Sequence, residues 1–98
     1  MSFRHVVMFT WTDDAPGDQS ERVRAGLDAL PALIPEIRSY VHGTDVGESD
    51  GAFDYALVAD FDDIEAFRVY RDHPKHVEFI NAVITGNVAA RAAVQYLT

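Results

Sequence analysis

Residues 3–11, FRHVVMFTW, form a predicted β-strand that is apolar on both faces in its middle, and this pattern constrains the fold most. Branched and aromatic residues favour strands, and successive strand side chains point to opposite faces. One face carries Phe3, His5, Val7, Phe9 and Trp11, and the other carries Val6, Met8 and Thr10. A sheet with one solvated face would alternate apolar and polar residues instead. Both faces of this strand therefore need a cover.

The whole chain contains four predicted strands and two helical regions in the order β-α-β-β-α-β. The expected strands are residues 3–11, 37–46, 53–61 and 91–97; the expected helices are residues 19–33, 63–72 and a segment from Pro74 onward. This order predicts an α+β, ferredoxin-like fold, with a four-stranded antiparallel sheet and helices on one face. With 98 residues, we expect a single domain, residues 1–98.

Capping residues and prolines indicate where the helices begin and end, and helical spacing indicates which face is buried. We expect Asp18 or Ser20 to cap the first helix, and Pro31 and Pro35 to fray or end it. Helical spacing predicts that this helix buries Val23, Leu27, Leu30 and Ile34. In the segment after Pro74, the residues available for burial are Val77, Ile80, Ala82 and Ile84.

The second face of the sheet predicts a homodimer. Residues 53–61 repeat the two-sided apolar pattern, so the pattern belongs to the sheet and not to one strand. The helices can cover only one face, and a second copy of the chain is the simplest cover for the other. We therefore expect the chain to pair with itself, sheet face to sheet face.

Composition argues against several function classes. The net charge of -8 argues against nucleic acid and anionic membranes as partners. The chain has no cysteine, so thiol chemistry and thiolate metal sites are excluded. We see no segment long and apolar enough to span a membrane and no cleavable leader, so a cytoplasmic protein is expected.

The segment YRDHPKH, residues 70–76, is the first candidate site. The residue before a proline avoids the α region, and proline favours the first position of a helix. His73 is therefore expected to cap a helix that starts at Pro74. His76 then lies in its first turn, where the helix dipole favours a neutral ring. Tyr70 lies across the bend and can reach the same patch of sheet.

The histidines also have simpler interpretations. His5 sits among apolar residues and could be a satisfied core residue or a cavity wall. His73 and His76 could be only capping or surface residues. His42 shares with Tyr40 a strand position facing the other way, and we expect a structural or interfacial role for it. A zinc site is the competing interpretation, but the spacings match no metal signature, so no metal ligand is predicted.

The chain resembles the stress-responsive α/β-barrel (Dabb) family of dimeric α+β barrels over nearly its whole length. The resemblance rests on FRHVVMFTW, LPALIPEIRSYVHGTDV, YALVADFDDIEAFRVY and YRDHPKHVEF. It implies a ferredoxin-like fold whose sheets pack face to face in a dimer. The family includes a plant polyketide cyclase that performs an aldol closure without a cofactor. The resemblance assigns its catalytic roles to His5, Tyr70 and His76, in a cavity between sheet and helices.

Such chemistry fits these residue types. Removing a proton next to a carbonyl needs a base such as His76. The enolate and the aldol oxyanion need hydrogen-bond donors, which Tyr70 and His5 supply. Apolar walls would hold a small apolar or aromatic ligand and exclude water; the expected wall residues are Phe3, Val7, Phe9, Phe67, Phe79 and Ile80.

Other functions stay open at this point. No cofactor is predicted, and the resemblance allows a cyclase-like lyase, a non-catalytic small-ligand-binding protein or a cofactor-independent monooxygenase. A purely structural interaction module is a further possibility. The chain also departs from many family members, because Gln95 stands where they end their last strand with an aspartate.

Overall fold

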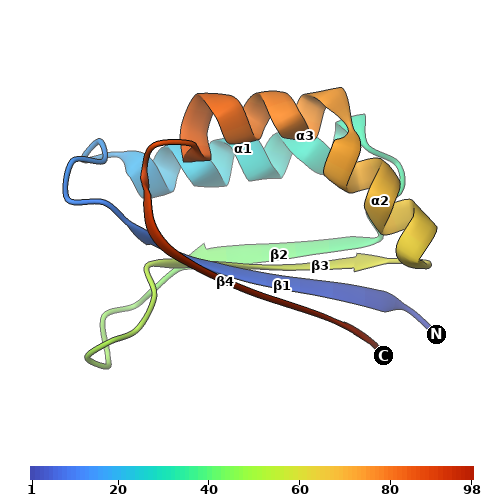
Figure 1. Ribbon diagram of the computed structural model, residues 1–98, viewed down its shortest axis with the longest axis horizontal. Coiled ribbons are helices and arrows are strands. Elements are labelled where there is room, and N and C mark those ends of the chain that lie inside the picture. The colour runs from blue at the N-terminus through green and yellow to red at the C-terminus, as the bar shows by residue number, and fades with distance from the viewer.

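The computed structural model describes residues 1–98 as one antiparallel sheet with all helices on one side (Figure 1). Its elements are β1 (Phe3–Trp11), α1 (Gln19–Leu33), β2 (Ser39–Thr44), β3 (Tyr55–Phe61), α2 (Ile64–Asp72), α3 (Pro74–Phe79), the π-helix η1 (Ile80–Ile84) and β4 (Val88–Leu97). The strand order is β2-β3-β1-β4, and each neighbouring pair is antiparallel. The predicted ferredoxin-like α+β fold is confirmed.

The core lies between the helices and the sheet face that they cover. Alternate residues of β1 and β3 are buried there, as their two-residue period requires. His5 pairs with Ala59 and Val7 with Leu57 across the two strands. The buried residues on this face are Phe3, His5, Val7, Phe9, Tyr55, Leu57, Ala59 and Phe61.

Helix α1 buries its predicted stripe but differs at both ends from the expectation. Val23, Leu27, Leu30 and Ile34 are all buried. Asp18 occupies the N-cap position without a side-chain hydrogen bond to the helix, so the predicted cap is wrong. Pro31 lies inside the helix and does not end it, because the Ile34 N–H still bonds to the Leu30 carbonyl at 2.9 Å. The helix ends just before Pro35.

The junction between α2 and α3 forms as predicted around Pro74. His73 is extended, with φ −62° and ψ 133°, and its Nδ1 accepts a hydrogen bond from the Lys75 backbone N–H at 3.1 Å. Pro74 occupies the first turn of α3. The proline therefore separates two short helices at a sharp bend.

The π-helix η1 was not predicted, and it changes which side chains are buried. Its wide turn is closed by a hydrogen bond from the Thr85 N–H to the Ile80 carbonyl at 2.8 Å. Phe79 and Ile84, five residues apart, are therefore both buried. Val77 and Ala82 are exposed, so their predicted burial is wrong.

Strand boundaries shift by two or three residues from the expected ones. The second strand is shorter at both ends, and the third begins at Tyr55. The last strand begins at Val88 instead of residue 91, because a bulge at Thr10/Trp11 lets Val88 pair with Trp11. The longer last strand places Val88 and Ala90 beside Trp11 and Thr10 of β1.

The outer sheet face, away from the helices, carries a cross-strand row of valines between an apolar row and a polar row that includes the Arg4–Asp60 ion pair. Val41, Val58, Val6 and Val94 pair in register across β2, β3, β1 and β4. The next row contains Gly43, Ala56, Met8 and Ala92. No helix covers this face (Figure 1). None of the helices has the length and apolar character needed to cross a bilayer.

Candidate active site

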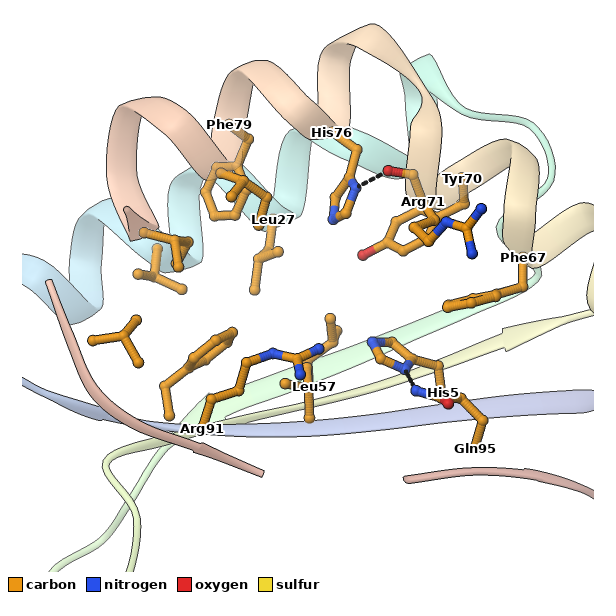
Figure 2. A pocket seen from close by; sticks show the side chains of 16 residues that line it. His5, Leu27, Leu57, Phe67, Tyr70, Arg71, His76, Phe79, Arg91 and Gln95 are labelled. Atoms are coloured by element: carbon orange, nitrogen blue, oxygen red, sulfur yellow. Dashed lines mark hydrogen bonds between the residues drawn. The ribbon is translucent and has the colours of Figure 1, made fainter. Parts of the chain in front are cut away.

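A cavity of about 520 Å³ lies between the helices and the covered sheet face (Figure 2). Arg71, Arg91 and Gln95 are its exposed members, so its mouth lies beside β4. Eleven of the sixteen lining residues are hydrophobic, which suits an apolar ligand. The lining residues are His5, Val7, Phe9, Val23, Leu27, Leu57, Phe67, Tyr70, Arg71, His76, Phe79, Ile80, Ile84, Val88, Arg91 and Gln95.

Tyr70 and His76 meet at the bend between α2 and α3. Their ring centroids are 4.2 Å apart, with 32° between the planes. The bend at Pro74 brings the first turn of α3 next to the last turn of α2. Both side chains project into the cavity (Figure 2). The predicted convergence of these two residues is therefore present in the structure.

His76 presents an unprotonated nitrogen to the cavity. Its Nδ1 lies 3.0 Å from the Arg71 backbone carbonyl, which can only accept, so Nδ1 carries the proton. Nε2 is left with a free lone pair. Burial lowers the pKa of His76, although the Arg71 carbonyl raises it and the charges of His73 and Asp72 act in opposite directions. The neutral ring expected from the helix dipole is thus produced mainly by desolvation.

His5 presents the opposite tautomer. The Gln95 side-chain Nε2 donates to His5 Nδ1 at 2.8 Å, so the proton of the neutral ring is on Nε2. Phe67 packs against the ring, with centroids 5.1 Å apart. Burial, together with the charges of Arg91 and His76, lowers the pKa of His5 to about 4. At neutral pH, His5 is a hydrogen-bond donor toward the cavity.

Tyr70 is held by Tyr40, a residue that the sequence did not mark as part of the site. The two hydroxyl oxygens are 2.7 Å apart. Burial raises the pKa of Tyr70 to about 12, although the hydrogen bond with Tyr40 acts in the opposite direction. Burial raises the pKa of Tyr40 as well, with further contributions from Tyr70. Either hydroxyl can donate in this pair, and when Tyr40 donates, the Tyr70 proton is free for a ligand.

His42 lies outside the cavity and has a structural role, as expected. Its Nδ1 is 2.7 Å from the Tyr55 hydroxyl and its Nε2 is 2.8 Å from Asp28 Oδ1. The predicted orientation of His42 and Tyr40 is wrong, since both face the helices. The register of β2 explains this, because Tyr40 pairs with Ala59 and His42 with Leu57, two buried positions.

Most of the expected wall residues line the cavity, and Phe3 does not. Phe3 stacks behind Phe67, with ring centroids 4.9 Å apart, and supports the wall from outside. Gln95 and Arg91 were not predicted as site residues; Gln95 was noted only as a departure from a family pattern. The alternation of side chains along β4 could have indicated them, because Gln95 pairs with His5 and Arg91 with Phe9, and both partners lie on the covered face. No group of three His, Asp or Glu side chains is arranged to hold a metal ion.

The fold and site define a ferredoxin-like α+β domain with a largely apolar cavity between sheet and helices. The chain belongs to the Dabb family, the stress responsive A/B barrel domain, whose model matches residues 3–97. An uncharacterized protein of Streptomyces coelicolor is 33% identical over 76 residues, covering 74% of this chain and 77% of that protein.

Solved structures with the same fold include a dimeric protein and an enzyme. A dimeric ferredoxin-like protein of unknown function from Thermobifida fusca is 43% identical, with a TM-score of 0.91, over 100% of this chain and 92% of that one. A hydroxynitrile lyase from Passiflora edulis is 20% identical, with a TM-score of 0.85, over 99% of this chain and 93% of that one. At this identity the lyase establishes the shared fold alone.

Proposed function

We propose that the protein is a cofactor-free lyase-type enzyme of carbonyl chemistry, similar to a polyketide cyclase, with His76 as base and Tyr70 and His5 as donors. The observation that carries the proposal is the pair of hydrogen bonds that the two histidines make with the Arg71 carbonyl and the Gln95 amide, which imply opposite tautomers. A lone pair on His76 Nε2 and a proton on His5 Nε2 are presented to one apolar cavity. A base and a donor are the two functions that enolate chemistry requires.

The proposed reaction balances with these groups. His76 Nε2 takes a proton from the carbon next to a carbonyl, and the carbonyl oxygen becomes an enolate that accepts hydrogen bonds from Tyr70 and His5. The enolate carbon attacks a second carbonyl and forms a carbon–carbon bond. The resulting alkoxide takes back the proton from the His76 imidazolium. A pKa of about 12 keeps the Tyr70 hydroxyl protonated, so it remains a donor at neutral pH.

The shape and polarity of the cavity support this assignment. Val7, Phe9, Phe67, Phe79 and Ile80 would hold the apolar part of the substrate. Their apolar surface also strengthens the hydrogen bonds inside by excluding water. A lyase on the same fold is consistent with this class of reaction.

The test is proton exchange at carbon, which needs no knowledge of the natural substrate. The probe is a panel of aryl 1,3-diketones in D₂O, with deuterium incorporation next to the carbonyl followed by NMR. The wild-type protein should accelerate exchange, and His76→Ala should abolish the acceleration. Val77→Ala is the matched control, because Val77 is exposed on the same helix. Equal exchange rates for His76→Ala and the wild type would refute the role of His76.

A non-catalytic small-ligand-binding protein is the second candidate. The predominance of hydrophobic lining residues favours it, because binding alone requires nothing more. It predicts binding of the diketones without exchange by any variant. Oxygen consumption in the same assays would instead support the cofactor-independent monooxygenase alternative.

We also propose that the protein is a homodimer that joins its outer sheet faces. Val41 and Val94 are 64% and 55% exposed, although they belong to a continuous row of valines. An exposed apolar row of this kind is typical of an interface. The Thermobifida fusca protein, which is similar over the whole chain, is dimeric.

A further inference from the structure

Arg91 is a charged residue on the face of β4 that otherwise contributes to an apolar cavity. It pairs with Phe9, and the next residue on the same face, Ala93, pairs with Val7. The Arg91 side chain lines the cavity and extends from β4 toward His5 (Figure 2). This position places its charge at the mouth of the cavity and away from the outer face proposed for the dimer.

Arg91 differs from the other basic side chains because it has no partner in the fold. The chain has eight Lys and Arg residues. Five of them form ion pairs with acidic side chains: Arg4, Arg38, Arg68, Arg71 and Lys75. Arg22 and Arg24 hydrogen-bond to Ala82 and Thr44. Arg91 alone makes neither kind of contact, in a chain with sixteen acidic residues.

The cavity itself holds positive charge and no negative charge. No Asp or Glu is among its lining residues. Arg71 also lines the mouth, but its guanidinium is paired with the Asp72 carboxylate at 2.9 Å. The unbalanced charge in the cavity therefore belongs to Arg91. The effect reaches the proposed catalytic groups, since the charge of Arg91 contributes to lowering the pKa of His5.

We propose that Arg91 binds a carboxylate of the substrate, so that the cavity takes an apolar or aromatic compound carrying both a carboxylate and a carbonyl. One free guanidinium matches the single charge and the two oxygens of a carboxylate. The carboxylate lies at the mouth beside Arg91, the carbonyl lies between His5 and Tyr70, and the apolar part contacts Leu27 and Phe79. This inference rests on the proposed function, because it takes the cavity to be the substrate site.

The test compares two ligands that differ only in charge, 4-phenylbutanoate and 4-phenylbutanamide. Trp11 is the single tryptophan and stacks on the cavity residue Phe9 with centroids 5.3 Å apart, so its fluorescence reports binding. The wild-type protein should bind the carboxylate about tenfold or more tightly than the amide. Arg91→Gln should remove this preference, and Arg91→Lys should keep part of it. Arg68→Gln, on the exposed side of α2, is the matched control and should bind like the wild type.

A second readout separates charge recognition from a packing effect. Binding of 4-phenylbutanoate should raise the pKa of His5 in the wild-type protein, because the anion neutralises Arg91, and should raise it less in Arg91→Gln, where no guanidinium holds the carboxylate at the mouth. Equal affinity of the wild type for both ligands, no binding of either ligand at millimolar concentration, or a preference retained in Arg91→Gln would each overturn the proposal. His76→Ala should keep the preference, so loss of catalysis and loss of carboxylate recognition are distinguishable.

Discussion

At the scale of single residues, one hydrogen bond to each of His76 and His5 determines which ring nitrogen carries the proton. The Arg71 backbone carbonyl holds the proton of His76 on Nδ1, and the Gln95 amide leaves the proton of His5 on Nε2. Neither contact involves the atom that faces the cavity. Each one sets the protonation of the opposite ring nitrogen, as partners of metal-bound or catalytic histidines commonly do. Gln95 is therefore a positioning residue for His5.

Gln95→Glu should reverse the tautomer of His5. A carboxylate cannot donate, so His5 Nδ1 would take the proton and Nε2 would lose it. The negative charge should also raise the pKa of His5 from its value of about 4. Because a donor to the enolate is lost, we expect the diketone exchange rate to fall about 10²-fold.

The measurement for this variant is the ¹⁵N chemical shifts of the His5 ring, together with the exchange rate. Gln95→Leu separates the two effects, since it removes the contact without adding charge. Ala89→Glu adds a charge at an exposed position of β4 and should change neither value. An unaltered His5 tautomer in Gln95→Glu would show that the amide does not control it.

At the scale of elements, the cavity depends on a close approach of α1 and α3. Gly26 of α1 faces Phe79, and a Cβ at position 26 would overlap the Phe79 ring. Phe79 is also a cavity wall and lies next to the π-helix. Gly26 therefore makes room for the ring that closes this side of the cavity.

Gly26→Ala should destabilise the protein, although alanine is favoured over glycine in helices by about 1 kcal/mol. Overpacking against Phe79 should lower the free energy of unfolding by about 1–3 kcal/mol, measured by urea denaturation. Combining it with Phe79→Leu should restore much of this loss. Gly17→Ala, which meets no atom within 4 Å, is the control. A stabilised Gly26→Ala protein would mean that the ring moves aside without cost.

The elements also show where sequence reasoning succeeds and where it fails. The strand alternation and the proline at position 74 are local signals, so the fold, the inner face of β1 and the His73 cap were predictable. The π-helix was not, because its extra residue per turn leaves no distinct composition in INAVI. Arg91, Gln95 and Tyr40 were missed as site residues because their orientation depends on strand register, which a bulge and the turn lengths determine.

At the scale of the whole molecule, the two faces of the sheet have different roles. The covered face contributes to the cavity, and the outer face carries the valine row that we assign to the dimer interface. The two-sided apolar pattern of residues 3–11 is explained by this division. A chain of 98 residues buries a modest core, and a second copy adds buried apolar area.

Val58→Glu should convert the dimer to a monomer, measured by light scattering at micromolar concentration. The carboxylate would lie in the middle of the apolar row, where burial without a partner is costly. Val69→Glu places the same charge on an exposed position of α2, and this variant should remain dimeric. Far-UV circular dichroism checks that both variants stay folded. A monomeric wild-type protein, or a dimeric Val58→Glu, would contradict the proposed interface.

The central claim is that His5 and His76 present opposite tautomers to one largely apolar cavity, and a ¹⁵N NMR titration of the four histidines tests it most directly. The account predicts that His5 titrates near pH 4 with its neutral proton on Nε2. It predicts that His76 titrates below 6.5 with its neutral proton on Nδ1. If both rings titrate near 6.5 as mixtures of tautomers, they are hydrated and independent, and the base and donor roles assigned to them are wrong.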